Sequence, residues 1–235
     1  MVINDVHVPD QCPLLWQTAL RWILDNKPDE ILILGDFGEY ESMSQHGSAA
    51  DTPTLRQDLE DNRQALEVLR RHAPNARFTY AEGNHETRPK RAGSAVLPRV
   101  ASILDVPHML GLNDLGIGWV KEGRMIRRGK LRFVHGYWAS DNAAKTHLTK
   151  YGFSIACGHV HRPQVFTMPD GENNIRAAYV LPCMRTLDAA WLNGKPSGWT
   201  NGFSVHEYDD EGDFTLQMIL AKDGKFIWNG RSYRP

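Results

Sequence analysis

Five short motifs carry side chains that can bind metal ions, and each follows an apolar, strand-like run. In chain order they are Asp5-Val6-His7, Gly35-Asp36, Gly83-Asn84-His85-Glu86, Val134-His135-Gly136 and Gly158-His159-Val160-His161. Imidazole, carboxylate and amide oxygen suit zinc, manganese, iron or nickel rather than a thiolate site. The candidate ligands are Asp5, His7, Asp36, Asn84, His135, His159 and His161. These seven groups are too many for one tetrahedral ion, but they suffice for two ions if one carboxylate is shared.

The elements that must position these motifs alternate between strands and helices. Apolar runs at residues 2–3, 31–34 and 78–81 are typical of strands, and the second is apolar throughout, as in a strand covered on both faces. Helical spacing of apolar residues follows at 15–23 and after Thr52-Pro53, where we expect a helix to begin. This β-α-β-α-β order predicts parallel strands with right-handed crossovers. The loops at their carboxyl ends, which carry the first three motifs, should therefore meet.

The remaining residues extend the same domain, so we expect one domain over residues 1–235. The pattern weakens at about 88–130, which we interpret as an insertion beside the site, with a helix near 95–104 and a hairpin turning near Arg128-Gly129. Strand-like runs return at 131–134, 154–157, 175–181, 203–208, 214–219 and 226–228, and a helix is expected at 143–151.

Taken together, the motifs resemble those of the calcineurin-like metallophosphoesterase superfamily, D-x-H, G-D-x-x-D, G-N-H-[DE], H and G-H-x-H, over roughly residues 1–165. The resemblance implies an α/β (α+β) fold, a four-layer sandwich of two mixed β-sheets flanked by helices. It also implies a binuclear centre that hydrolyses phosphate mono- or diesters with a metal-bridging hydroxide. Manganese is the favoured metal, and zinc, iron or nickel are compatible with the same ligands.

Carried over by motif, the resemblance assigns a role to each residue of the site. Asp5, His7 and His161 would hold one ion, Asn84, His135 and His159 the other, and Asp36 would bridge them. His85 would lie outside the metal shell, beside the substrate phosphate, as a general acid or a stabiliser of the transition state. Asn84 and Arg88 would contact the substrate.

Within the superfamily the chain looks most like the phage and prophage branch. Arg88 follows the third motif, and the tail carries Trp199-Thr200-Asn201-Gly202-Phe203. Two positions depart from the general pattern. Glu39 stands where the family has the second Asp of its second motif, and Tyr40 replaces the Arg that marks the protein Ser/Thr phosphatases. A phosphoprotein substrate is therefore disfavoured.

Basic residues form two runs, whose functional and structural readings both stay open. The first comprises Arg88, Lys90, Arg91 and Arg99, and the second comprises Lys121, Arg124, Arg127, Arg128, Lys130 and Arg132. Either run could bind the phosphates of a nucleic acid or nucleotide. The alternative is a solvated helix face and hairpin. His46, His72, His108, His147 and His206 lie outside the motifs and are expected in surface or capping roles.

The composition excludes several classes of protein. With 27 Lys plus Arg against 28 Asp plus Glu, the net charge of -1 gives no bulk attraction to nucleic acid or acidic membranes. Three cysteines without a C-x-x-C pair suit a reducing compartment, and we expect all three to be buried thiols. No run reaches the ~20 apolar residues of a membrane span. We expect a cytoplasmic protein, in the host cytoplasm if a phage encodes it.

Two functions of different classes remain. The first is a metal-dependent phosphoesterase, possible substrates being nucleic acids or nucleotides. The second is a catalytically silent metal-binding scaffold or interaction protein with the same fold. His85 argues for the enzyme, because a scaffold has no use for a histidine beside the metals that is not a ligand. The sequence does not indicate an oligomeric state.

Overall fold

A six-stranded sheet forms around the amino-terminal β-α-β-α-β unit of this computed structural model, which describes residues 1–44, 52–96, 98–99, 101–172, 174–189 and 192–235. Its strand order is β11-β10-β1-β2-β3-β4. The strands β1 (Val2–Ile3), β2 (Glu30–Leu34), β3 (Arg77–Ala81) and β4 (Ile117–Val120) are parallel, as expected. Antiparallel β10 (Gly202–Tyr208) and β11 (Phe214–Leu220) extend the sheet beyond β1.

The second sheet has five strands in the order β5-β6-β7-β9-β8. Parallel β6 (Leu131–Val134), β7 (Ile155–Cys157) and β9 (Ile175–Val180) form its centre, while β5 (Ile126–Arg128) and β8 (Gln164–Pro169) flank them antiparallel. Both sheets are therefore mixed. A separate hairpin of β12 (Phe226–Trp228) and β13 (Arg231–Tyr233) ends the chain.

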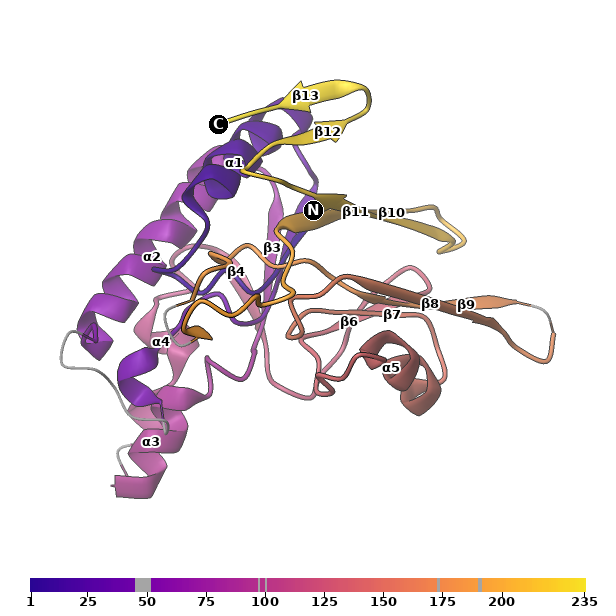
Figure 1. The fold of residues 1–235 in the computed structure, drawn as a ribbon. Coiled ribbons are helices and arrows are strands. Elements are labelled where there is room, and N and C mark those ends of the chain that lie inside the picture. Colours follow the sequence, from indigo (N-terminus) through magenta and orange to yellow (C-terminus); the bar gives the residue numbers. More distant parts are fainter. Residues whose placement is uncertain (45–51, 97, 100, 173, 190–191) are drawn as a thin grey trace.

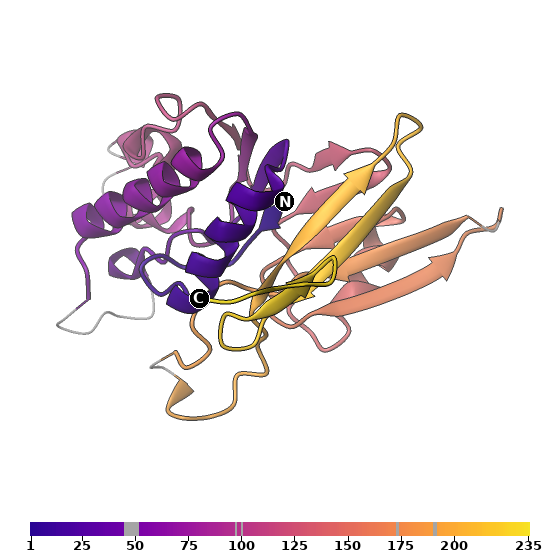
Figure 2. The ribbon, with the colours of Figure 1, turned by 90° about the horizontal axis from the view of Figure 1, so that it is seen from above.

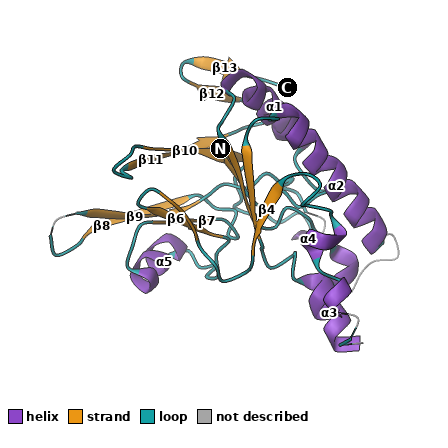
Figure 3. Cartoon of the chain, turned by 180° about the vertical axis from the view of Figure 1, so that it is seen from behind, coloured by secondary structure: helices purple, strands orange, loops and turns teal. Residues whose placement is uncertain are grey.

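Three apolar layers hold the molecule together and confirm the four-layer sandwich (Figures 1 and 2). One packs α1 (Pro13–Asn26) and α2 (Leu55–His72) on the outer face of the six-stranded sheet. A second lies between the two sheets, where Leu32 and Leu34 meet Leu131 and Phe133. The third packs α5 (Ala143–Tyr151) on the other sheet. Figure 3 shows the helices on the outside of the strands.

The helix α2 begins two residues later than the sequence predicts. Gln57 N donates to Thr54 Oγ1 at 3.3 Å, while Thr54 N donates to Gln57 Oε1 at 2.8 Å. This reciprocal capping box satisfies two amides that the first helical turn leaves without partners. Thr54 is therefore the N-cap, and Pro53 precedes it.

The segment at 88–130 contributes to both sheets. It contains α3 (Arg88–Val96), the short turns η2 (Ala101–Ile103) and α4 (Val106–Met109), and then β4 and β5. The helix thus lies earlier than the predicted 95–104, because it starts directly after the third motif. The hairpin at Arg128-Gly129 is confirmed by the antiparallel pairing of Arg128 with Leu131. A further short turn, η1 (Glu41–Met43), follows the second motif.

Two expectations about single residues need correction. Cys157 and Cys183 are buried free thiols, whereas Cys12 is only partly buried, at the start of α1. His147 is fully buried rather than a surface residue: its Nδ1 donates to Ala143 O at 2.8 Å and its Nε2 accepts from Tyr137 N at 3.3 Å. His46 lies outside the described residues.

Among the described helices, none is long and apolar enough to cross a membrane.

Candidate metal centre

The five motifs come together at the carboxyl ends of the parallel strands. Three groups of side chains each offer one ligand atom per residue within 4.8 Å of the others. They are Asp5 with His7 and His161, Asp36 with His135 and His159, and Asp36 with His7 and His85. The structure thus brings together all the predicted acidic and histidine ligands, and Asp36 belongs to two of the groups.

The first half of the site brings basic nitrogens close together. His7 Nε2 lies 3.2 Å from His161 Nε2, and His161 Nε2 lies 3.1 Å from Asp5 Oδ1. Two imidazole nitrogens whose lone pairs face each other repel unless a proton or a cation lies between or beside them. Because the backbone N of His159 donates to both carboxylate oxygens of Asp5, at 3.1 and 2.9 Å, the last motif also fixes the acid of the first.

The second half has the same character. His135 Nε2 lies 3.1 Å from Asp36 Oδ2 and 3.1 Å from Asn84 Oδ1, so an amide oxygen, a carboxylate and an imidazole converge. His135 Nδ1 donates to Leu34 O at 2.9 Å, which leaves Nε2 facing the acids. This donor set, without sulfur, fits divalent ions such as manganese, zinc, iron or nickel.

The electrostatics of the buried site favour cations. Although burial opposes the charged form, Asp36 raises the pKa of His135 to about 10. Burial likewise opposes ionisation of Asp36, but the charges of His135 and His85 hold the pKa of its carboxyl well below the ordinary value. Asp5 and Asp36 are 0% and 2% exposed. Buried carboxylates require a positive partner, which metal ions provide when they replace bound protons.

Glu86 organises the second and third motifs, a role that its place in the motif did not predict. Its carboxylate accepts from the backbone N of Asp36 at 2.9 Å, of Phe37 at 2.8 Å and of Gly83 at 2.8 Å. Tyr80 OH donates to it at 2.7 Å. Burial, followed by the charge of Asp36, raises the pKa of Glu86 to about 7. Glu86 therefore joins the loop that carries Asp36 to the loop that carries Asn84.

His85 and Arg88 lie beside the predicted ligand Asp36. The backbone N of His85 donates to Asp36 Oδ1 at 2.9 Å, and the ring Nε2 lies 3.7 Å from Asp36 Oδ2. His85 Nδ1 donates to Glu39 O at 3.0 Å, so Nε2 accepts from Arg88 Nη2 at 3.0 Å. Burial lowers the pKa of His85 to about 4. The neutral ring is thus held between a ligand and an arginine.

Sequence reasoning missed two residues around the site. Glu39, noted only as a departure, lies with Oε2 2.6 Å from His7 Nδ1. Arg185 carried no sequence signal, because it lies in an irregular loop after β9. Its Nη1 is 3.6 Å from Glu39 Oε2, and its guanidinium lies 5.1 Å from the ring centroid of Trp199. Trp199 in turn packs its ring against His161, with centroids 4.7 Å apart.

Three residues of the second basic run lie away from the site. Arg128 binds Glu30 through Nη2 at 2.6 Å, Lys130 Nζ pairs with Asp213 at 2.6 Å, and Arg132 lies over the Phe153 ring at 4.3 Å. These contacts lie at or near the β5–β6 turn, away from the end of β6 that leads to His135. For these three residues, the contacts therefore favour a structural role in a solvated hairpin over a role in phosphate binding.

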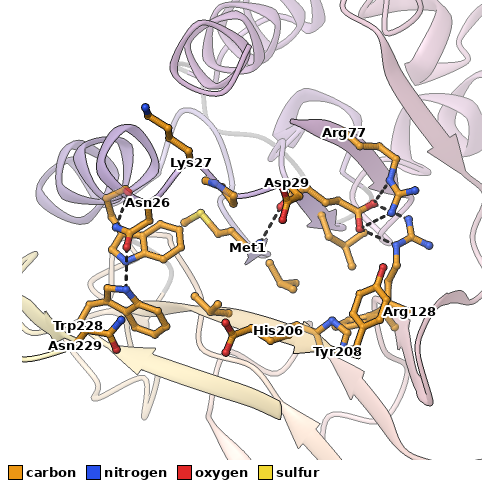
Figure 4. A pocket seen from close by; sticks show the side chains of 18 residues that line it. Met1, Asn26, Lys27, Asp29, Arg77, Arg128, His206, Tyr208, Trp228 and Asn229 are labelled. Atoms are coloured by element: carbon orange, nitrogen blue, oxygen red, sulfur yellow. Dashed lines mark hydrogen bonds and ion pairs between the residues drawn. The ribbon is translucent and has the colours of Figure 1, made fainter. Parts of the chain in front are cut away.

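A large cavity also lies away from the candidate ligands. It measures about 910 Å³ and opens at the amino ends of β1, β2 and β3, between Met1, Arg77, Arg128, His206 and Trp228 (Figure 4). Glu30 joins Arg77 and Arg128 at one side of it. No predicted ligand lines this cavity. The motif side chains lie at the opposite edge of the sheets, at the carboxyl ends of the strands.

Fold and site together define a calcineurin-like phosphoesterase. The family model for calcineurin-like phosphoesterase matches residues 1–163, and the chain belongs to this family. Its relatives include the Gene 54 protein of Mycobacterium phage L5, 24% identical over 249 residues, which span 98% of this chain and 96% of the phage protein. The Gene 54 protein of Mycobacterium phage D29 is 23% identical over 247 residues, with the same coverage. Both relatives confirm the resemblance to the phage branch.

A solved structure with a similar course of the chain is Vps29 of Chaetomium thermophilum. It covers 94% of this chain and 91% of its own, at 12% identity and a TM-score of 0.45.

Proposed function

We propose that this protein is a metal-dependent phosphoesterase with a two-metal centre. Asp5, His7 and His161 would hold one divalent ion, Asn84, His135 and His159 the second, and Asp36 both. Manganese is the favoured ion for this set of nitrogen and oxygen donors. Bound there, two cations would activate water as the nucleophile and offset the charge that develops on the phosphoryl oxygens.

The observation that carries the proposal is the position of Asp36. Its carboxylate lies within reach of His135 and His159 on one side and on the other of His7, which also groups with Asp5 and His161, and it is almost completely buried. A carboxylate shared in this way is the arrangement that allows seven ligands to serve two ions. One tetrahedral ion would leave several of these buried groups without a partner, at a substantial energetic cost.

The residues around the ligands have two tasks. Glu86 and the backbone of His85 hold Asp36 in place, so that little reorganisation is needed when cations bind. His85 Nε2 and Arg88 Nη2 lie together beside Asp36, where both can contact a phosphate that approaches the site. Arg88 also donates to Glu39 O at 2.7 Å, so its guanidinium is already oriented.

We propose phosphate mono- or diesters as the substrates, with nucleic acid and nucleotides as the first candidates. Arg88 supports an anionic substrate. Tyr40 supports the exclusion of phosphoprotein, because it stands where the Ser/Thr phosphatases carry Arg and is fully buried, so it cannot contact a substrate. Arg124 and Lys121 remain candidates for contacts to a longer polyanion, since Arg124 lines a small pocket with His135.

The test begins with metal-stripped protein. Mn²⁺ is added back, and hydrolysis is measured on a panel of phosphomonoesters and phosphodiesters that includes 5′- and 3′-phosphorylated oligonucleotides. We expect Mn²⁺-dependent hydrolysis of at least one class. If two ions bind and no ester is hydrolysed, the silent metal-binding scaffold replaces the enzyme.

A further inference from the structure

Glu39 contacts two histidines of the site. Its carboxylate contacts His7, and its backbone carbonyl contacts His85. Glu39 Oε2 lies 2.6 Å from His7 Nδ1, whereas His85 Nδ1 donates to Glu39 O at 3.0 Å and lies 3.4 Å from Glu39 Oε1. The side chain is one methylene longer than the Asp that the family pattern places here. The added length takes the carboxylate to His7.

This contact determines which nitrogen of His7 faces the metal site. Two guanidinium groups flank the Glu39 carboxylate, with Arg88 Nη1 3.2 Å from Oε1 and Arg185 Nη1 3.6 Å from Oε2. Their positive charges favour the ionised form of the carboxylate. An ionised carboxylate only accepts hydrogen bonds, so the proton is on His7 Nδ1. His7 Nε2 is then unprotonated and points toward His161 Nε2, 3.2 Å away.

Within the part of the chain that the structure describes, two other candidate ligand histidines, His135 and His161, lack a carboxylate partner at Nδ1. His135 Nδ1 donates to a neutral backbone carbonyl, that of Leu34. His161 Nδ1 is buried and has no hydrogen-bond partner among the described residues. An ionised acceptor forms a shorter and stronger hydrogen bond than a neutral one, and it increases the basicity of the opposite ring nitrogen.

Glu39 is itself held by arginines. Arg88 Nη1 lies 3.2 Å from its Oε1, and Arg185 Nη1 lies 3.6 Å from its Oε2. Arg185 is 4% exposed and pairs through Nη2 with Asp10 Oδ2 at 3.2 Å. These contacts form a continuous chain of charged groups from Asp10 through Arg185 and Glu39 to His7.

We propose that Glu39 is a positioning residue that fixes His7 with Nδ1 protonated and Nε2 directed at the cation, and that Arg185 holds Glu39 in place. The inference rests on the metal site of the proposed function. It adds a residue that contacts neither metal nor substrate and acts through His7.

The first test uses the metal-free wild-type protein and so needs neither activity nor a variant. Long-range ¹H–¹⁵N NMR of the histidine rings at pH 8 should show His7 protonated at Nδ1 and unprotonated at Nε2. Any other protonation pattern of His7 at that pH overturns the proposal.

The second test measures Mn²⁺ binding by calorimetry on Glu39→Gln, which keeps the shape of the side chain and removes its charge. Loss of an outer partner typically weakens metal affinity 10- to 100-fold, so one of the two sites should weaken by roughly that factor while the other is unchanged. Glu60→Gln is the matched control, because Glu60 pairs with Arg56 on the exposed surface of α2, and this variant should bind both ions as the wild type does. Unchanged affinity in Glu39→Gln, or equal loss at both sites, overturns the proposal.

The two proposals fail in different ways. A wild type that binds two ions and hydrolyses no ester ends the proposed function, and the role of Glu39 then still stands on the binding data. A wild type that hydrolyses esters, with a Glu39→Gln variant that binds both ions tightly, ends only the role of Glu39.

Discussion

Five of the candidate metal ligands have strained backbone conformations. Asp5, His7, Asp36, His159 and His161 have φ values of 50°, 55°, 49°, 68° and 60°. Such left-handed conformations are uncommon for residues other than Gly, and each costs on the order of 1–3 kcal/mol. The surrounding fold must supply this energy. The left-handed conformation allows short loops to turn their side chains back toward a common centre.

His85 offers a test of acid catalysis at the level of one residue. Because the pKa of about 4 leaves the His85 ring neutral in the metal-free protein, acid catalysis requires this ring to take up a proton when an anionic phosphate binds. An alkoxide leaving group needs such a proton, whereas a nitrophenolate needs it little. We predict that His85→Asn keeps both metals and loses activity on alkyl or nucleotide esters by roughly 10²–10⁴-fold, but much less on p-nitrophenyl esters. Kinetics on both ester types, with metal analysis, measure this.

Other outcomes reassign His85. Equal losses on both ester types would make it a stabiliser of the phosphoryl oxygens. Loss of metal would make it a ligand, as its group with His7 and Asp36 permits.

Gly83 provides a steric test of the loop that holds Asp36. A Cβ at this position would collide with Asp36 Oδ1 and lie 2.8 Å from Glu86 Oε2. We predict that Gly83→Ala displaces Asp36, weakens metal binding and lowers the free energy of unfolding by about 1–3 kcal/mol, as overpacking does. Gly171→Ala is the control, since a Cβ there meets nothing within 4 Å. Equal behaviour of the two variants in calorimetry and urea titration would contradict this steric account.

At the scale of elements, Glu30 of β2 joins the two sheets. It binds Arg77 of β3 at 3.0 Å and Arg128 of β5 at 2.6 Å. Although burial opposes ionisation, hydrogen bonds from Arg128 and Arg77 lower the pKa of Glu30 to about 2. The stabilisation by this carboxylate is therefore complete above its unfolded pKa and is lost as the pH falls toward about 2.

We predict that Glu30→Gln lowers the free energy of unfolding by about 1–3 kcal/mol near neutrality, the range for hydrogen bonds to charged groups. The variant should also lose less stability than the wild type between pH 4.5 and 2. Urea titrations over this range measure both effects. Parallel pH curves for the two proteins would show that Glu30 does not link the sheets energetically.

The positions of the strands, the parallel direction of β1 to β3 and the positions of the motifs are the features that the sequence predicts well. Continuous apolar runs followed by Asp, Asn or His identify β2, β3, β6 and β7 with the loops they position. The start of α2 is shifted because Thr54, rather than Thr52, finds a partner in Gln57. Arg185 could not be predicted, because its link to Glu39 depends on a tertiary contact between loops 146 residues apart in the chain.

At the scale of the whole molecule, the distribution of basic residues bears on substrate class. If Arg88 contacts an oligonucleotide, affinity should fall steeply with salt, and Arg88→Ala should reduce the salt slope by about one. Lys130→Ala is the control, because Lys130 pairs with Asp213 at the β5–β6 turn. The salt dependence of oligonucleotide affinity in this variant should match that of the wild type. Filter binding or fluorescence anisotropy over a salt series measures the affinity for the oligonucleotide. An affinity insensitive to salt would favour a small substrate.

The number of divalent ions bound per chain tests the central claim most directly. Elemental analysis after dialysis against Mn²⁺ should find about two ions per wild-type chain, because Asp36 lies within reach of His7 of the first proposed ligand set and of His135 and His159 of the second. Asp36→Asn should lower bound metal and activity together. At most one ion per chain in a fully active wild type would contradict the two-metal account.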